Sequence, residues 1–333
     1  MIIRTHAYAR AGLIGNPSDG YFGRTISITC RNFSASVSCY ESPRVAIVPR
    51  RRDQLEFNSI AELVNDVRIN GYYGGIRLIK AAVKRFYDYC DQRGIHLDNR
   101  NCTLEYETNV PARVGLAGSS AIVTAAMRAL MAFYGVEIPR PIQPNLILSV
   151  ELEELGIGAG LQDRVIQVYE NAVYMDFDQQ KMEAQGHGDY QPLDPALLPP
   201  LFVAYDAKLA EGTEVTHNDL RVRYNRGDEQ VHAAVRRWAE LAREARDLIV
   251  AGKGTEIGPL MDENFDLRAK TLKLNEHHRQ LVMVGRKHGA HAKYAGSGGA
   301  VIAAYDGDPA RLAKATAAYE AIGAKVFVPR ISA

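Results

Sequence analysis

The residues best suited to chemistry lie in a glycine- and serine-rich stretch, residues 111–121, which reads Pro-Ala-Arg-Val-Gly-Leu-Ala-Gly-Ser-Ser-Ala. Gly115 and Gly118 carry no Cβ that would hold a ligand away from the backbone. A strand pattern at 102–109 precedes the stretch, and an alanine-rich helical pattern at 121–134 follows it. The first N–H groups of a helix are unpaired within the helix, and its dipole adds partial positive charge there. The stretch therefore predicts an anion site suited to phosphate.

The serines at the end of this stretch, Ser119 and Ser120, leave several roles open. Their hydroxyl groups could cap the helix, bind a phosphate oxygen or hold a metal ion that bridges phosphates. A glycine loop with a serine cap and no ligand has the same composition. The stretch lacks the lysine of a Walker A loop, G-x-x-x-x-G-K-[ST], so it is not a loop of that kind.

Three further stretches combine turn-forming residues with reactive or phosphate-binding groups. Residues 15–23 are crowded with Gly, Asn, Pro and Ser around Asp19, and residues 155–164 are glycine-rich and end in Asp163 beside a helical pattern. Residues 293–303 carry three glycines that lead directly into a strand pattern. A surface turn, a helix cap and a tight hairpin, respectively, would explain these stretches without function.

The elements that position these stretches follow from periodicity and turn residues. Strands are expected at 3–14, 25–40, 102–109, 201–206 and 325–328, and helices at 59–70, 75–93, 121–134, 145–151, 163 onwards, 228–251 and 309–322. Residues 184–200 are rich in Pro and Gly and are interpreted as a connection between two domains, 1–190 and 200–333.

Composition sets limits on partners and location. The chain has 333 residues, 47% hydrophobic residues and a net charge of +1, which predicts a globular protein with no general attraction to nucleic acid or membranes. The four cysteines show no C-x-x-C spacing, and no signal peptide or long apolar run is evident. We therefore expect a cytoplasmic protein.

Taken together, these stretches resemble the three motifs of the GHMP kinases (galacto-, homoserine, mevalonate and phosphomevalonate kinases). Residues 10–21 are similar to the first motif, although Asn16-Pro17 stands where the family usually has Glu-His, so the roles of that pair are not carried over. Residues 111–121 resemble the second motif, P-x-x-x-G-L-x-S-S-A, with one extra residue, and residues 296–299 resemble the third, G-x-G-G.

The resemblance implies a mixed α+β fold with two domains. The N-terminal domain would be of the ribosomal-protein-S5-like type and the C-terminal domain ferredoxin-like. The active site would lie in the cleft between them, which agrees with the general preference of ligands for domain interfaces.

The resemblance also implies ATP and Mg²⁺ as cofactors and assigns roles to individual residues. Asp163 would orient or deprotonate the acceptor hydroxyl, and Arg10 would steady Asp163 or the transferring group. Ser120 and Glu151 would hold Mg²⁺, with Glu153 and Glu154 as alternatives to Glu151. The nucleotide would be bound by residues of the second and third motifs: Pro111, Gly115, Leu116, Ala117, Gly118, Ser119, Ser120, Ala121, Gly296, Ser297 and Gly298.

Longer blocks, residues 10–27, 71–78, 160–165 and 264–268, resemble the glucuronokinase branch of the family. This resemblance implies an ATP-dependent kinase that converts the sugar acid D-glucuronate to its 1-phosphate. Asp19 and Tyr21 would contact the sugar. Its carboxylate needs a cation, preferably a guanidinium, and the candidates are Arg24, Arg77 and Arg268.

Other functions stay open from the sequence. The acceptor could instead be galacturonate, a neutral hexose or a heptose phosphate. A regulator that binds nucleotide without turnover is a further alternative, although such a protein has no need of an acid at the acceptor hydroxyl. The sequence makes no prediction of oligomeric state.

Overall fold

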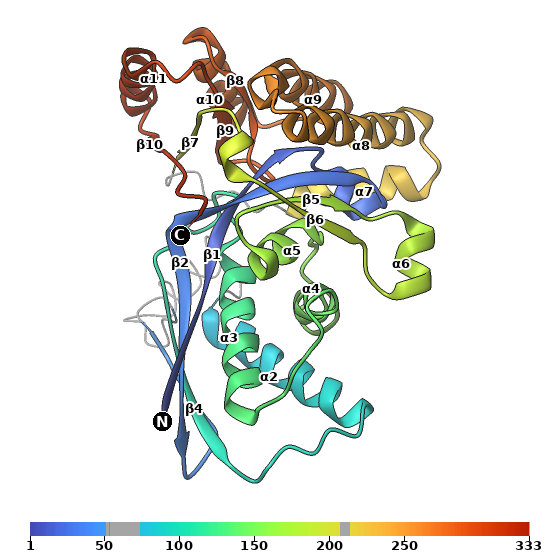
Figure 1. Cartoon of the computed structure of the whole chain (residues 1–333), viewed down its shortest axis with the longest axis vertical. Helices are drawn as coiled ribbons and strands as arrows, with labels where there is room; N and C mark the ends of the chain where they lie inside the picture. The colour runs from blue at the N-terminus through green and yellow to red at the C-terminus, as the bar shows by residue number, and fades with distance from the viewer. Residues whose placement is uncertain (51–52, 54–73, 207–213, 333) are drawn as a thin grey trace, which may run out of the picture.

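The computed structural model describes residues 1–50, 53, 74–206 and 214–332, with only the backbone for residues 214–218. Two β-sheets follow one another along the chain, each accompanied by its own helices (Figure 1). The mixed α+β fold expected from the sequence is confirmed. The expected helix at 59–70 lies outside the described residues.

The first sheet is built around two long antiparallel strands that share a turn. Its strands are β1 (Ile2–Ile14), β2 (Arg24–Ser42), β3 (Ala46–Val48), β4 (Asn101–Thr108), β5 (Ala172–Asp176) and β6 (Asp189–Leu193). They run in the order β3-β4-β2-β5-β6, with β1 also paired to β2. The turn between β1 and β2 contains Asp19, so strand pairing fixes the position of the first motif.

Helices cover one face of this sheet. They are α2 (Gly75–Gln92), α3 (Gly118–Tyr134), α4 (Gln143–Ser149) and α5 (Gln162–Tyr169), and the short α6 (Gln179–Gln185) lies between β5 and β6. Eleven of the residues of α3 are buried, because it packs against β1 and β2 on one side and α2 on the other. The second motif therefore leads into a helix held in the core.

The second half of the chain forms a four-stranded antiparallel sheet. Its strands are β7 (Leu201–Tyr205), β8 (His291–Tyr294), β9 (Ala300–Ala304) and β10 (Lys325–Phe327), in the order β10-β7-β9-β8. The accompanying helices are α7 (Glu214–Asn225), α8 (Glu229–Val250), α9 (Gly258–Thr271), α10 (Glu276–Lys287) and α11 (Pro309–Ala321). The third motif is the turn between β8 and β9.

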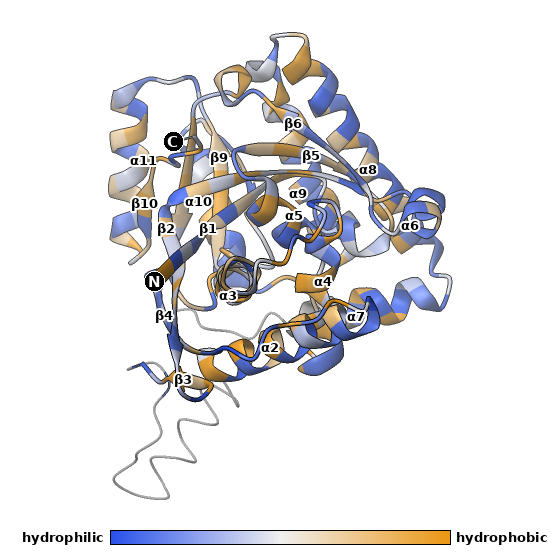
Figure 2. Cartoon of the chain, turned by 60° about the horizontal axis from the view of Figure 1, so that its bottom comes forward, coloured by the Kyte–Doolittle hydropathy of each residue, from blue (hydrophilic) through white to orange (hydrophobic). Residues whose placement is uncertain are grey.

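One hydrophobic core joins the two sheets. It contains Leu13 and Ile28 from the first sheet, Val203 and Ile302 from the second, and Trp238 from α8, all fully buried. Hydrophobic and hydrophilic residues alternate along α8 (Figure 2), as expected for a helix with one face in the core. The sheets are therefore packed as one body around α8.

The connection between the sheets is shorter than the sequence suggests. Residues 184–200 were expected to link two domains, yet β6 lies within this segment and pairs with β5. The chain leaves the first sheet at Leu193 and enters the second at Leu201. Among the described residues, no helix is long and apolar enough to cross a membrane.

Candidate active site

The second motif adopts a backbone that favours anion binding. Arg113, Gly115 and Ala117 all have positive φ angles, of 58°, 75° and 62°, at alternating positions. Alternation of this kind turns successive N–H groups toward one concave side of the loop. Positive φ is uncommon outside glycine and is retained mainly where the surrounding structure imposes it. The loop then enters α3 at Gly118.

Backbone contact between the second and third motifs explains two of their glycines. A Cβ on Gly115 would lie 2.6 Å from the carbonyl oxygen of Gly298, and a Cβ on Gly296 would overlap the carbonyl oxygen of Gly115. Larger residues cannot occupy these positions without moving a backbone. The two loops thus form a continuous backbone surface above α3.

Arg10 joins all three motifs through one guanidinium group. Its Nε donates to Asp163 Oδ1 at 2.6 Å, and its Nη1 donates to the carbonyl oxygens of Gly115 at 2.5 Å and Ala295 at 3.2 Å. Only 5% of Arg10 is exposed. The family resemblance implied that Arg10 steadies either Asp163 or the transferring group, and in the structure Arg10 and Asp163 form an ion pair.

A second carboxylate, that of Asp19, faces the same region. A Cβ on Gly160 would overlap Asp19 Oδ2, and the backbone N–H of Gln162 donates to this oxygen at 3.4 Å. Burial raises the pKa of Asp19 to about 6, and the nearby charge of Asp163 acts in the same direction. Two acids with different surroundings therefore lie close together in this region.

Glu151 connects α4 to the second motif. Beyond α4 the helix widens into a π-helical turn, Val150–Glu154, in which Glu151 is buried. Its carboxylate accepts a hydrogen bond from Ser119 Oγ at 2.8 Å and forms a short ion pair with Arg164. Burial, followed by the charge of Arg10, lowers the pKa of Arg164 to about 9.

The structure separates the three glutamates that the sequence left as alternatives. Glu153 pairs with Arg85 at 2.9 Å and Glu154 with Lys84 at 2.9 Å, both on α2. Glu151 is thus the member of this group whose carboxylate contacts the second motif. The hydroxyl of Ser120, in contrast, is buried and donates to the carbonyl oxygen of Ala117 at 3.2 Å.

The three arginines proposed for the sugar carboxylate lie in different surroundings. Arg24 forms an ion pair with Asp176 at 3.1 Å. Arg268 is buried and donates to the carbonyl oxygens of Gly296 and Ser297, at 2.9 and 3.1 Å. It therefore supports the third motif. Arg77 lies in the first turn of α2, and its Nε is buried with no hydrogen-bond partner among the described residues.

The sequence analysis missed several side chains that hold the site. Lys293 is buried and donates to the carbonyl oxygens of Gly12, at 2.9 Å, and Tyr294, at 2.7 Å, and to Asn16 Oδ1 at 2.5 Å. Burial, followed by the charges of nearby arginines, lowers its pKa well below the ordinary lysine value. Asn264 accepts from the N–H of Gly15 at 2.6 Å. Arg164 follows Asp163 directly, and Lys293 lies shortly before the third motif. This closeness in sequence was the one signal that could have identified them.

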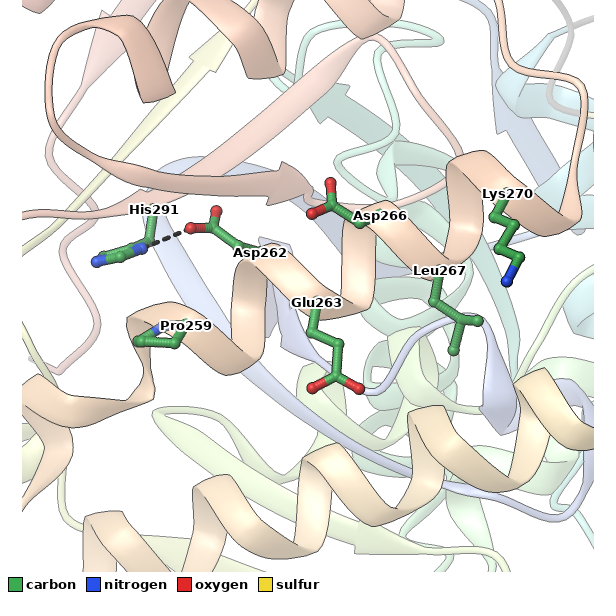
Figure 3. Close-up of a pocket in the computed structure, with 7 residues that line it drawn as sticks. All are labelled: Pro259, Asp262, Glu263, Asp266, Leu267, Lys270 and His291. Atoms are coloured by element: carbon green, nitrogen blue, oxygen red, sulfur yellow. Dashed lines mark hydrogen bonds and ion pairs between the residues drawn. The ribbon is translucent and has the colours of Figure 1, made fainter.

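A surface pocket elsewhere on the molecule does not belong to this site. It lies along α9 and is lined by Pro259, Asp262, Glu263, Asp266, Leu267, Lys270 and His291 (Figure 3). Each of its acids is already paired: Asp262 with Arg286 and His291, Glu263 with Arg237, and Asp266 with Arg286. We interpret this region as a surface ion-pair network.

Comparison with known proteins agrees with this geometry. A sequence profile described as the GHMP kinases N terminal domain matches residues 77–171. The chain is 43% identical over 306 residues to Glucuronokinase 1 of Arabidopsis thaliana, covering 90% of this chain and 84% of that protein. The chain belongs to the GHMP kinase family. Membership implies that this kinase uses ATP.

Solved structures of other family members share the fold across the whole chain. Galactokinase of Lactococcus lactis, complexed with galactose, matches with a TM-score of 0.74 and 17% identity over 99% of this chain and 93% of that chain. Phosphomevalonate kinase of Streptococcus pneumoniae matches with a TM-score of 0.75 and 16% identity, covering 98% of each chain. At these identities the two solved structures show the fold alone. Glucuronokinase 1 of Arabidopsis thaliana, at 43% identity, is therefore the more informative relative for the site.

Proposed function

We propose that this GHMP kinase transfers the γ-phosphoryl group of ATP to the anomeric hydroxyl of D-glucuronate, producing glucuronate 1-phosphate and ADP. The observation that carries the proposal is the 43% identity to Glucuronokinase 1, which extends over 90% of the chain. The ion pair between Arg10 and Asp163 supports turnover over binding alone, because it places an acid where an acceptor hydroxyl would be activated.

The nucleotide phosphates would lie on the backbone of the second and third motifs. The positive-φ residues of 113–117 and the start of α3 direct N–H groups toward one side, and Gly115, Gly296 and Gly298 allow the two loops to approach each other. Arg268 keeps the third motif in place by binding its carbonyl oxygens. Phosphoryl transfer depends on this kind of alignment and charge stabilisation.

Ser119 and Glu151 are suited to hold Mg²⁺. A hydroxyl and a carboxylate 2.8 Å apart provide the hard oxygen ligands that this ion prefers, and few protein ligands are needed when phosphates and water complete its shell. Bound magnesium would offset the charge that develops on the transferring phosphoryl group. The sequence analysis named Ser120 as a magnesium ligand. We propose Ser119 in its place, because the Ser119 hydroxyl donates to Glu151.

Asp163 would accept the proton of the sugar hydroxyl, and Arg10 would fix the orientation of its carboxylate. Because Arg10 also binds the carbonyl oxygens of Gly115 and Ala295, the acid and both phosphate loops are held by one group. Asp19 would accept a hydrogen bond from a second hydroxyl of the sugar. A site with these contacts would hold the acceptor oxygen next to the γ-phosphate.

The experiment is ADP release with a panel of acceptors, with and without Mg²⁺. Glucuronate, galacturonate, glucose and galactose are compared at equal concentrations. We expect magnesium-dependent ADP release with glucuronate and much less with the others. Equal release with glucose, or release with none of the sugars, would contradict the proposal.

A further inference from the structure

An arginine of α7 lies against the turn that would bind the sugar. The guanidinium carbon of Arg221 is 4.7 Å from the centre of the Tyr21 ring, and a Cβ on Gly20 would lie 3.2 Å from Arg221 Nη2. Gly20 and Tyr21 directly follow Asp19. Arg221 lies 201 positions after Gly20 in the sequence (221 minus 20), yet it brings a positive charge to the first motif.

Arg221 has the properties of a cation that is available to a ligand. It is exposed, and no ion pair joins it to a carboxylate within the residues that the structure describes. Arg223, two residues further along α7, differs in each respect: it pairs with Asp228 at 2.8 Å and donates to the carbonyl oxygen of Thr271. The arginines of residues 221–226 read in the sequence as a solvated face or as part of a segment near a site, and nothing in the sequence connects Arg221 to the first motif.

Aromatic contacts fix where Arg221 is presented. The Tyr21 ring lies 4.7 Å from that of Tyr224 on α7, and Tyr224 stacks on His232 of α8 at 4.2 Å. This chain of rings anchors α7 beside the first motif. A guanidinium group carries several N–H donors, so the contact of Arg221 with Tyr21 leaves others able to bind an anion.

The chemistry of a sugar acid matches this placement. In a pyranuronate, C1 carries the reacting hydroxyl and C5 carries the carboxylate, and both flank the ring oxygen. A site that holds the first group at Asp163 must therefore place a cation within the length of one sugar ring. Asp19 connects these regions: its carboxylate accepts from the N–H of Gln162, which precedes Asp163, and its neighbours in sequence contact Arg221.

The arginines considered from the sequence are less suited to this role. Arg24 already has a carboxylate partner in Asp176, and Arg268 uses two of its nitrogens on the third motif. Arg77 belongs to α2, whose first turn lies beside Asp53 and Tyr106. We propose that Arg221 is the residue that binds the sugar carboxylate and so selects a uronate over a neutral sugar; this inference rests on the proposed function.

The test compares two acceptors that differ only in charge. Wild type and Arg221→Met are assayed with glucuronate and with glucuronamide, which has the same ring stereochemistry and a neutral amide. Arg226→Met is the matched control, because Arg226 is an exposed arginine that follows the same helix. Arg221→Lys retains the charge without the planar fork.

If Arg221 makes a charged hydrogen bond to the carboxylate, its removal should lower activity with glucuronate selectively. In Arg221→Met we expect kcat/KM for glucuronate to fall roughly 10- to 100-fold, while kcat/KM for glucuronamide and KM for ATP change by less than about threefold. Arg221→Lys should recover part of the loss, and Arg226→Met should behave as wild type.

Two results for the variant would overturn the inference. An equal loss with both acceptors would mean that Arg221 only supports Tyr21, and an unchanged preference for glucuronate would place the carboxylate elsewhere, with Arg77→Met as the next variant. If the wild type itself does not phosphorylate glucuronate, the proposed function fails first and this inference with it. That result is seen before any variant is made, so the two failures are distinguishable.

Discussion

At the scale of single residues, the site contains two carboxylates with opposite surroundings. Asp163 is held by Arg10 at 2.6 Å and lies 3.5 Å from Arg164. Asp19 is buried, and desolvation, the largest influence on it, raises its pKa to about 6. Because a pair of acids with separated properties is a common feature of catalytic sites, the contrast supports distinct roles for the two.

The raised pKa of Asp19 predicts a pH-dependent cost in stability. In the unfolded chain the group titrates at its ordinary pKa of 3.8, and in the folded chain at about 6. The folded state therefore loses stability as pH rises between these values, and the full cost is present above about pH 6. Asp19→Asn should raise the free energy of unfolding by about 1–3 kcal/mol at about pH 7.5 and by nearly nothing at about pH 4. Denaturant unfolding at both pH values measures this.

Asp163→Asn is the matched control and should have the opposite sign. Removing this carboxylate leaves the guanidinium of Arg10 buried without its partner, and breaking a buried pair commonly costs about 3–5 kcal/mol. A gain in stability for Asp163→Asn, or a pH-independent effect of Asp19→Asn, would show that the two environments are described wrongly.

Replacing each of the two serines of the second motif by alanine should have a different effect. Ser119→Ala removes the hydroxyl that contacts Glu151, so we expect a higher Mg²⁺ concentration for half-maximal activity, by roughly tenfold. Ser120→Ala removes a buried hydroxyl bonded to Ala117, so we expect a loss of stability of about 1 kcal/mol with an unchanged Mg²⁺ requirement. Mg²⁺ titration and thermal unfolding measure both effects. If Ser120→Ala raised the Mg²⁺ requirement and Ser119→Ala did not, Ser120 would be the ligand.

Sequence reasoning at this scale was effective where residues lie within a motif. Arg10, Asp163 and the second and third motifs were named from their surroundings in sequence, and the structure brings Arg10, Asp163 and both loops into contact. Arg221 and Asn264 could not be assigned in the same way, since their contacts depend on tertiary packing between distant segments. The choice between Ser119 and Ser120 depends on the rotation of a helix turn, which no local pattern fixes.

At the scale of elements, the two phosphate loops depend on glycine for two separate reasons. Gly115 has a φ of 75°, which any other residue adopts only with strain, and it also lies against the carbonyl oxygen of Gly298. Gly94 has a φ of 64° with open space around it. A comparison of variants at Gly94 and Gly115 therefore distinguishes the effect of backbone strain from that of steric contact.

Replacement of these glycines by alanine should give different results. Gly94→Ala should cost about 1 kcal/mol in stability and leave kinetics unchanged. Gly115→Ala should also displace the third motif and raise KM for ATP by at least about tenfold. Steady-state kinetics with ATP as the varied substrate, together with thermal unfolding, measures both effects. Equal KM values for ATP in the two variants would contradict close contact between the loops.

Most elements of the fold could be predicted from periodicity and turn residues. The helices at 75–93 and 228–251 correspond to α2 and α8, and the strand at 102–109 corresponds to β4. The π-helical turn at 150–154 could not be predicted, because its residues have ordinary helical spacing, and the buried ion pair of Glu151 with Arg164 joins it to a distant segment. The strand β6 was missed because its Pro and Gly neighbours are typical of a linker.

At the scale of the whole molecule, the shared core predicts cooperative unfolding. Trp238 is fully buried between the sheets, its indole N–H donates to the carbonyl oxygen of Asn264 at 3.1 Å, and it is the single tryptophan of the chain. We therefore expect tryptophan fluorescence and far-ultraviolet circular dichroism to report the same unfolding midpoint in denaturant. Two separated transitions would show that the halves fold independently.

We propose that the site built by Arg10, Asp19 and Asp163 phosphorylates a sugar acid at its anomeric carbon. The most direct measurement supplies ATP and Mg²⁺ with an equimolar mixture of glucuronate and glucose and identifies the products by mass spectrometry and ³¹P NMR. The account predicts glucuronate 1-phosphate in excess over hexose phosphate by at least about tenfold, with the phosphorus coupled to the anomeric proton. Hexose phosphate as the main product, or phosphate on another carbon of glucuronate, would contradict it.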